Sequence, residues 1–254
     1  MRDGVKVFAA LSGDVEPLLA CGWLLSTVRG TTVTVGLSDL GPGAGPCARG
    51  FMDAHFLRQG HDNETLLGAA ATQARRLATQ LPGDGALDLV HEPPVDDHDL
   101  LLVSRPSPGQ SLSSNPAYRN AEAKKFRAVL VAPREPPTCL GRSVTVLADG
   151  PPRDLPLFGL ARRLFPAMAS VHLILDERTG SDRGAEWLPR LACQCPIQVS
   201  TVRRTGDAQA DAVLRAGGDV LIMERSVRFW HSVTFDWRLS SFLDRTPGAV
   251  LFTS

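Results

Sequence analysis

The sequence has no excess of charge of either sign and no long apolar run. Lysine plus arginine number 27, and aspartate plus glutamate also number 27. Such a balanced chain has no basic field to attract nucleic acid or anionic lipid non-specifically. No apolar stretch approaches the roughly 20 residues of a transmembrane helix, and residues 1–13 are too short and too interrupted for a signal peptide. We expect a cytoplasmic protein, or the cytosolic part of a membrane protein, that does not bind nucleic acid.

Cysteine is scarce, and its pattern excludes a disulfide framework. There are five cysteines, an odd number at irregular spacing. Cys193 and Cys195 form the only close pair, and no second Cys or His pair accompanies them. His55 and His61 lie in a stretch that is typical of a polar surface loop, and the histidines of His91–His98 stand at opposite ends of a connector. We therefore expect no metal site.

Motifs for covalent catalysis or phosphate cradling are also absent from the sequence. It contains no nucleophile elbow, no Walker loop and no Gly-x-Gly-x-x-Gly pattern, and no His or Cys is clearly paired with a base. We expect no catalytic residue, and a protein that is more readily a binding module than an enzyme.

The stretch Phe126–Gly150 indicates how the chain is organised. Two apolar, β-branched runs flank a connector that is rich in proline and glycine. Arg127–Ala132 is predicted as the last strand of one unit, and Ser143–Asp149 as the first strand of a second, similar unit. The expected domains are therefore residues 1–134 and 141–254, related as a tandem duplication.

Strands and helices alternate in both units. The strands of the first unit are predicted at Val5–Leu11, Thr31–Leu37, Ala86–Val90, Asp99–Ser104 and Arg127–Ala132. Those of the second unit are predicted at Ser143–Asp149, Ser170–Asp176, Ile197–Arg203, Asp219–Glu224 and Gly248–Thr253. This alternation is typical of an α/β fold, here two tandem open parallel five-stranded sheets with helices on both faces.

The helices between these strands follow from apolar spacing and from capping residues. They are predicted at Val15–Arg29, Glu64–Leu81, Pro116–Lys125, Arg153–Phe165, Ser181–Ala192, Asp207–Arg215 and Val233–Asp244. Ser38–Asn63 is predicted to be irregular. Only a short connector, His91–His98, stands where the first unit needs its third crossover helix, so we expect that helix to be reduced or lost.

Ligands of open parallel sheets bind beyond the carboxyl ends of the strands, where the strand order reverses. In this order that switch point lies at the ends of the first and fourth strands of each unit. The candidate binding residues are Ser12, Asp14, Ser104 and Arg105 in the first unit, and Asp149, Gly150, Arg225 and Ser226 in the second. Asp149 is also explained as a turn residue that caps the next helix, and the arginines as solvated strand-end residues.

Three stretches of the second unit resemble universal stress proteins, of the adenine-nucleotide α-hydrolase-like superfamily. These stretches are VLADGPPRD, ADAVLRAGGDVLIMERS and PGAVLFTS. The resemblance implies Rossmann-like units whose closing strands, Arg127–Ala132 and Gly248–Thr253, pair antiparallel into a pseudo-dimer. It also implies ATP or AMP as the ligand, with Asp149 at the aspartate of the adenine pocket and Asp14 as a looser match.

The glycine-rich loop that holds phosphates in the ATP-binding branch of that family is degenerate in this chain. The second unit has no glycine after its fourth strand and carries Phe229, Trp230 and Trp237 there, while the first unit has only Gly109. Without glycine the backbone cannot easily approach a phosphate. Adenine-nucleotide binding is therefore expected to be weak or lost.

Three functions remain open from the sequence. The first is a universal-stress-like binding and regulatory protein with degenerate nucleotide sites. The second is the cytosolic regulatory domain of a membrane transporter, whose partner would be the membrane domain. The third is an enzyme that binds ATP or AMP and hydrolyses it slowly, for which the phosphate ligands are missing.

Overall fold

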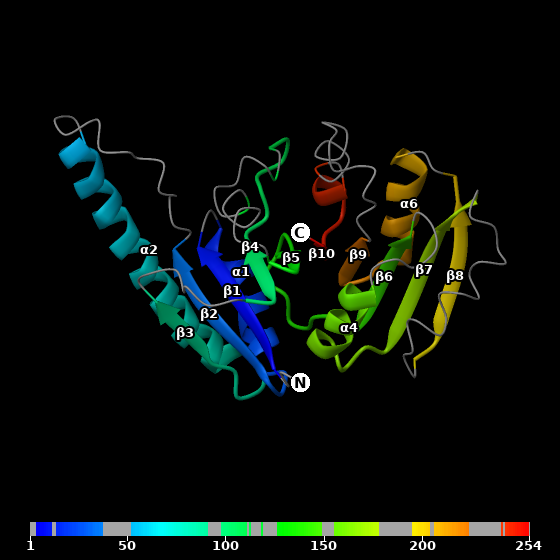
Figure 1. The fold of residues 1–254 in the computed structure, drawn as a ribbon, viewed down its shortest axis with the longest axis horizontal. Coiled ribbons are helices and arrows are strands. Elements are labelled where there is room, and N and C mark those ends of the chain that lie inside the picture. Colours follow the sequence, from blue (N-terminus) through cyan, green and yellow to red (C-terminus); the bar gives the residue numbers. More distant parts are fainter. Residues whose placement is uncertain are drawn as a thin grey trace.

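The computed structural model describes residues 4–11, 14–37, 52–90, 98–110, 112, 118, 126–148, 155–177, 195–203, 206–223, 240 and 242–253. Their strands form one ten-stranded sheet in the order β3-β2-β1-β4-β5-β10-β9-β6-β7-β8. Figure 1 shows this sheet crossing the whole molecule, with the amino-terminal part of the chain on one side and the carboxyl-terminal part on the other. We call residues 4–132 the first half and residues 143–253 the second half.

Both halves have the same internal order of parallel strands. The first half contains β1 (Val5–Leu11), α1 (Val15–Ser26), β2 (Thr31–Leu37), α2 (Met52–Gln80), β3 (Leu87–Val90), β4 (Leu100–Val103) and β5 (Ala128–Val131). The second contains β6 (Ser143–Ala148), α4 (Leu155–Leu164), β7 (Ser170–Asp176), β8 (Ile197–Val202), α6 (Gly206–Ala216), β9 (Val220–Met223) and β10 (Ala249–Thr253). In each half the first strand pairs with the second on one side and with the fourth on the other. The predicted α/β class and the duplication are confirmed.

The two five-stranded sheets join through their closing strands. β5 and β10 pair antiparallel, with Val131 opposite Val250 and Val129 opposite Phe252. All four of these side chains are buried. The expected pairing of Arg127–Ala132 with Gly248–Thr253 is confirmed, and we call this strand pair the junction.

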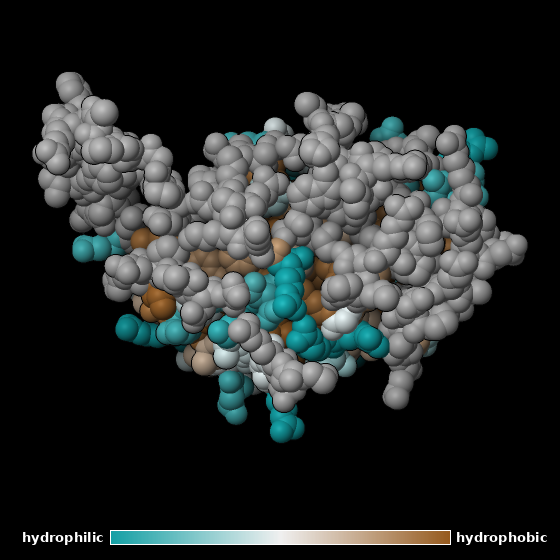
Figure 2. Space-filling view, in the orientation of Figure 1, coloured by the Kyte–Doolittle hydropathy of each residue, from teal (hydrophilic) through white to brown (hydrophobic). Residues whose placement is uncertain are grey.

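Apolar layers cover both faces of the sheet, and each layer runs through both halves. Residues of α1, α2 and α4 pack with one set of strand side chains, while α6, Leu112, Tyr118 and Phe242 pack with the alternate set. Helix α4 of the second half also contacts β1 of the first. In the space-filling view of Figure 2, apolar residues show on either side of a band of hydrophilic residues near the centre of this face. The halves therefore share one core on each face.

An aspartate directly before the fourth strand anchors the start of the first strand in both halves. Asp99 accepts a hydrogen bond from the Lys6 amide at 3.1 Å, and its own amide donates to the Lys6 carbonyl at 2.9 Å. Asp219 accepts from the Arg142 and Ser143 amides at 3.0 and 2.9 Å, and its amide donates to the Ser143 carbonyl at 2.9 Å. The duplication thus extends to individual side-chain bonds.

The structure corrects two predicted helix boundaries. Helix α2 begins at Met52, so residues 52–63 are helical rather than irregular; this stretch contains no proline and a single glycine, and it continues a strong helix. Helix α1 ends at Ser26 rather than at Arg29. The hydroxyls of Ser26 and Thr27 donate to the carbonyls of Trp23 and Leu24, which gives side-chain donors to carbonyls of the last turn.

Several predicted segments lie largely outside the described residues. They are the helices at Pro116–Lys125, Ser181–Ala192 and Val233–Asp244 and most of the connector His91–His98. Nine residues separate β3 from β4, whereas β8 and β9 are connected through the 11 residues of α6.

Candidate functional site

Three of the eight candidate binding residues are described, and all three belong to the first half. They are Asp14, Ser104 and Arg105, at the carboxyl ends of β1 and β4. The other five lie outside the described residues: Ser12, Asp149, Gly150, Arg225 and Ser226. The geometry below therefore concerns the switch point of the first half.

Asp14 and Ser104 come together because β1 and β4 are neighbours in the sheet. The Ser104 hydroxyl donates to the Asp14 carbonyl at 3.0 Å, and Ser104 is only 2% exposed. The Asp14 carboxylate accepts from the Glu16 amide at 3.3 Å and is the N-cap of α1. A carboxylate at this place satisfies an amide that would otherwise face an anionic ligand.

Arg105 is half-buried, and its guanidinium reaches main-chain carbonyls beside the junction. Its Nε donates to the Ala132 carbonyl at 3.2 Å, and its Nη1 donates to the Leu243 carbonyl at 2.5 Å. The same Nη1 also donates to the Thr246 carbonyl, and Nη2 donates to the Gly248 carbonyl. Four of the five N–H groups of the guanidinium therefore contact main-chain oxygens.

The charge of Arg105 is held in a desolvated place. The pKa of Arg105 is lowered to about 10, mainly by burial and to a smaller extent by the positive charge of Arg134, while Asp244 acts in the opposite direction. The group stays protonated at neutral pH because this pKa is still well above 7. Its partners are neutral carbonyls, three of which belong to the end of the second half.

Sequence reasoning missed the segment that receives Arg105. We call Phe242–Gly248 the carboxyl-terminal turn; it leads directly into β10. Arg134 also binds it, through Nη2 to the Asp244 carbonyl at 2.9 Å and through its amide to the Pro247 carbonyl at 3.1 Å. Carbonyl acceptors more than 130 residues away leave no signal in a sequence pattern.

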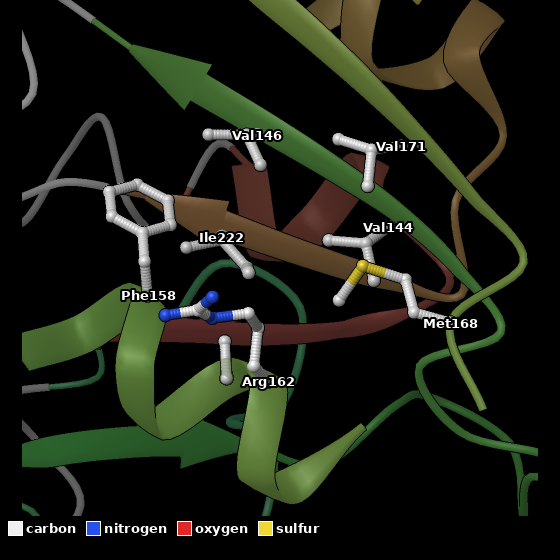
Figure 3. A pocket seen from close by; sticks show the side chains of 8 residues that line it. Val144, Val146, Phe158, Arg162, Met168, Val171 and Ile222 are labelled. Atoms are coloured by element: carbon white, nitrogen blue, oxygen red, sulfur yellow. The ribbon is translucent and has the colours of Figure 1, made fainter. Parts of the chain in front are cut away.

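A small cavity lies between α4 and the sheet of the second half. Figure 3 shows Phe158 and Arg162 on one side of it and Val144, Val171 and Ile222 on the other. The centre of a water molecule has only about 10 Å³ in which to move there, which is close to the space that one water needs. This cavity is too small for a nucleotide and lies within the core.

A wider, open depression of about 530 Å³ lies at the amino-terminal side of β7 and β8. Its walls are formed by residues that include Phe165, Met168 and Cys195. It is remote from the switch points, because those lie at the carboxyl ends of the strands.

The described residues form neither a membrane-spanning helix nor a cluster of metal ligands. None of their helices is long and apolar enough to cross a membrane. Nor do they bring three or more His, Cys, Asp or Glu side chains together in a way that could hold a metal ion. His98, at the end of the connector His91–His98, packs its ring edge-on against Phe8, with the ring centres 5.8 Å apart.

No family model and no curated protein matches the sequence. Solved structures do match over nearly the whole chain. A universal stress protein from Archaeoglobus fulgidus aligns with a TM-score of 0.68 and 14% identity, covering 98% of this chain and 96% of that one. A putative universal stress protein from Pseudomonas aeruginosa aligns with a TM-score of 0.53 and 10% identity, covering 99% and 94%.

A third match is the cytoplasmic domain of a prokaryotic cation chloride cotransporter. Its TM-score is 0.51 and its identity 11%, covering 98% of this chain and 94% of that one. At sequence identities this low, the structural alignments show the fold that the proteins share and not the chemistry of their sites. The chain therefore has the tandem fold seen in universal stress proteins: two Rossmann-like halves joined into one sheet.

Proposed function

We propose that this chain is a universal-stress-like binding and regulatory module in which adenine-nucleotide binding is weak or lost. The observation that carries the proposal is the position of Arg105. Among the described candidate residues of the first switch point, this arginine is the one whose charge suits an anionic ligand, and its guanidinium binds four main-chain carbonyls instead. The neighbouring Asp14 carboxylate caps α1.

The second half is where residual ligand binding is expected. Asp149 and Gly150 follow β6, and Arg225 and Ser226 follow β9, which pairs with β6. The carboxyl ends of these paired strands form the second switch point. We therefore propose that any adenine nucleotide, ATP or AMP, binds there through Asp149.

The test is a calorimetric titration of the purified chain with ATP, ADP and AMP. We expect dissociation constants weaker than about 100 µM, corresponding to less than about 5.5 kcal/mol of binding free energy. The Asp149→Ala variant is compared with Asp88→Ala, in which the aspartate is on the outer strand β3 and exposed. Saturable low-micromolar binding that only Asp149→Ala removes would contradict the weakened site and show an intact nucleotide sensor.

A second candidate function is the regulatory domain of a membrane transporter. It is favoured by the full-length likeness to a cotransporter's cytoplasmic domain. The check is the reading frame that encodes this chain. Transmembrane helices encoded in the same uninterrupted frame would support this function, whereas stop codons on both sides of the region would exclude a covalent membrane partner.

A further inference from the structure

Arg105 connects two segments that are far apart in the sequence. It directly follows Ser104 at the end of β4, and its loop continues through Gly109 and Gln110. Three of its four carbonyl partners, those of Leu243, Thr246 and Gly248, belong to the carboxyl-terminal turn. One side chain therefore spans from the switch point of the first half to the last segment of the second half.

The carbonyls that Arg105 binds lie where a positively charged donor is favourable. Leu243 and Thr246 lie at the end of a short helical segment, where main-chain carbonyls lack partners within the helix and carry partial negative charge. Gly248 lies just before β10. Removing the guanidinium would leave these oxygens without their donor in a place that is mostly shielded from water.

A second contact links the same two segments independently. The Gly109 amide donates to the Asp244 carboxylate at 3.4 Å. The loop itself is closed by the Gln110 amide, which donates to the Ser107 carbonyl at 2.9 Å, and the turn by the Thr246 amide, which donates to the Phe242 carbonyl at 2.8 Å. Each segment thus has its own internal hydrogen bond from a main-chain amide, and hydrogen exchange at that amide reports whether the segment is open.

We propose that Arg105 is a conformational latch, through which the loop 104–110 of the first half and the carboxyl-terminal turn of the second half open and close as one unit. A ligand or partner that orders or displaces either segment would then change the other across the junction. This coupling rests on contacts that the Arg105 and Asp244 side chains make within the chain itself, so it does not require a bound nucleotide.

The test is hydrogen exchange of the ligand-free full-length chain, comparing the native protein with Arg105→Lys. Lysine keeps the charge but lacks the planar fork that reaches several carbonyls at once. We expect the Gln110 and Thr246 amides to exchange about tenfold faster, by the same factor, because both depend on one local opening. The Val7 amide of β1 should be unchanged, whereas a general loss of stability would accelerate it as well.

The matched control is Arg203→Lys, the same change at an arginine whose side chain is 82% exposed; it should alter neither segment. Faster exchange in only one of the two segments, or in neither, would overturn the latch. If Arg105→Lys does not fold, Asp244→Ala decides the question, since it keeps Arg105 and removes the contact with Gly109 and the negative charge near the guanidinium. It must then accelerate exchange in both segments, and an effect confined to the turn would overturn the proposal.

Discussion

At the scale of single residues, the paired aspartates Asp99 and Asp219 explain why an aspartate precedes the fourth strand of each half. Asp219 binds two amides, of Arg142 and Ser143, and thereby fixes where the second half begins. Asp99 binds one amide, that of Lys6. The carboxylates therefore hold neighbouring strands in register, β1 with β4 and β6 with β9, rather than a ligand, since they lie at the amino-terminal ends of these strands.

Asp219→Asn is expected to destabilise the protein by about 2 kcal/mol, because one of two charge-assisted hydrogen bonds is replaced by an amide group facing an amide. Asp99→Asn should cost less, about 1 kcal/mol, because it affects one amide hydrogen bond and an ion pair with the largely exposed Arg127. Urea unfolding measures both values. Equal midpoints for Asp219→Asn and the native protein would contradict this role.

His172 gives the fold a dependence on pH. Its ring is bonded to the Ser200 hydroxyl at 3.0 Å, and burial lowers the pKa of His172 below its ordinary value. The unfolded chain therefore takes up a proton at a higher pH than the folded chain does. The stability that the neutral His172 contributes is fully present above about pH 6.5, the pKa of histidine in the unfolded chain. It is lost as the pH falls below that value towards the lowered pKa of the folded state.

Replacing His172 with glutamine should make unfolding less sensitive to acid. The measurement is the melting temperature of the native protein and of His172→Gln at about pH 7.5 and about pH 5. The melting temperature of the native protein is expected to fall more on acidification than that of the variant. The same loss in both would show that other groups account for the acid sensitivity.

At the scale of elements, Gly141 determines how the linker enters β6. Its φ is 71°, and a Cβ at this position would lie 2.2 Å from Cγ of Phe165, which is buried. Gly217, after α6, has a similar φ of 66° but open space around it. Alanine at Gly141 would therefore add backbone strain and steric overlap, whereas alanine at Gly217 would add backbone strain alone.

Gly141→Ala is expected to cost about 3 kcal/mol or more, because strain and overlap add. Gly217→Ala should cost about 1 kcal/mol, from strain alone. The two variants can be compared by denaturant unfolding under the same conditions. Similar losses in both would show that Phe165 moves aside without cost.

The strands were the most predictable elements. The bounds of β1, β2 and β7 agree with the prediction, because each is an apolar, β-branched run between turn residues. The start of α2 was not predictable in the same way, since histidines, aspartates and Gly60 within it are equally typical of a loop. The sequence predicted Arg105 as a binding residue or a solvated strand-end residue, because its carbonyl acceptors carry no side-chain signature.

At the scale of the whole molecule, the junction makes each half incomplete. The side chains of β5 are buried on both faces, and β10 covers its outer edge. A first half alone would expose this apolar strand edge, which is a template for pairing with another chain. The predicted domain boundaries, 1–134 and 141–254, can be tested through this property.

Residues 1–134 expressed alone are expected to form a dimer through β5 or to aggregate. Light scattering coupled to size exclusion gives the mass directly. The control is the full chain, in which β10 occupies that edge. A folded, stable monomer of residues 1–134 at micromolar concentration would show that the junction is dispensable.

The covalent link between β5 and β6 has a consequence for mass action. Only eleven residues, 132–142, separate these strands, and a short linker keeps tethered partners at an effective concentration of the order of millimolar. Two separate chains joined by such a strand pair would come apart on dilution, and their melting temperature would fall with concentration. Here the contact between the halves is set by the linker, so it persists at any abundance of the protein.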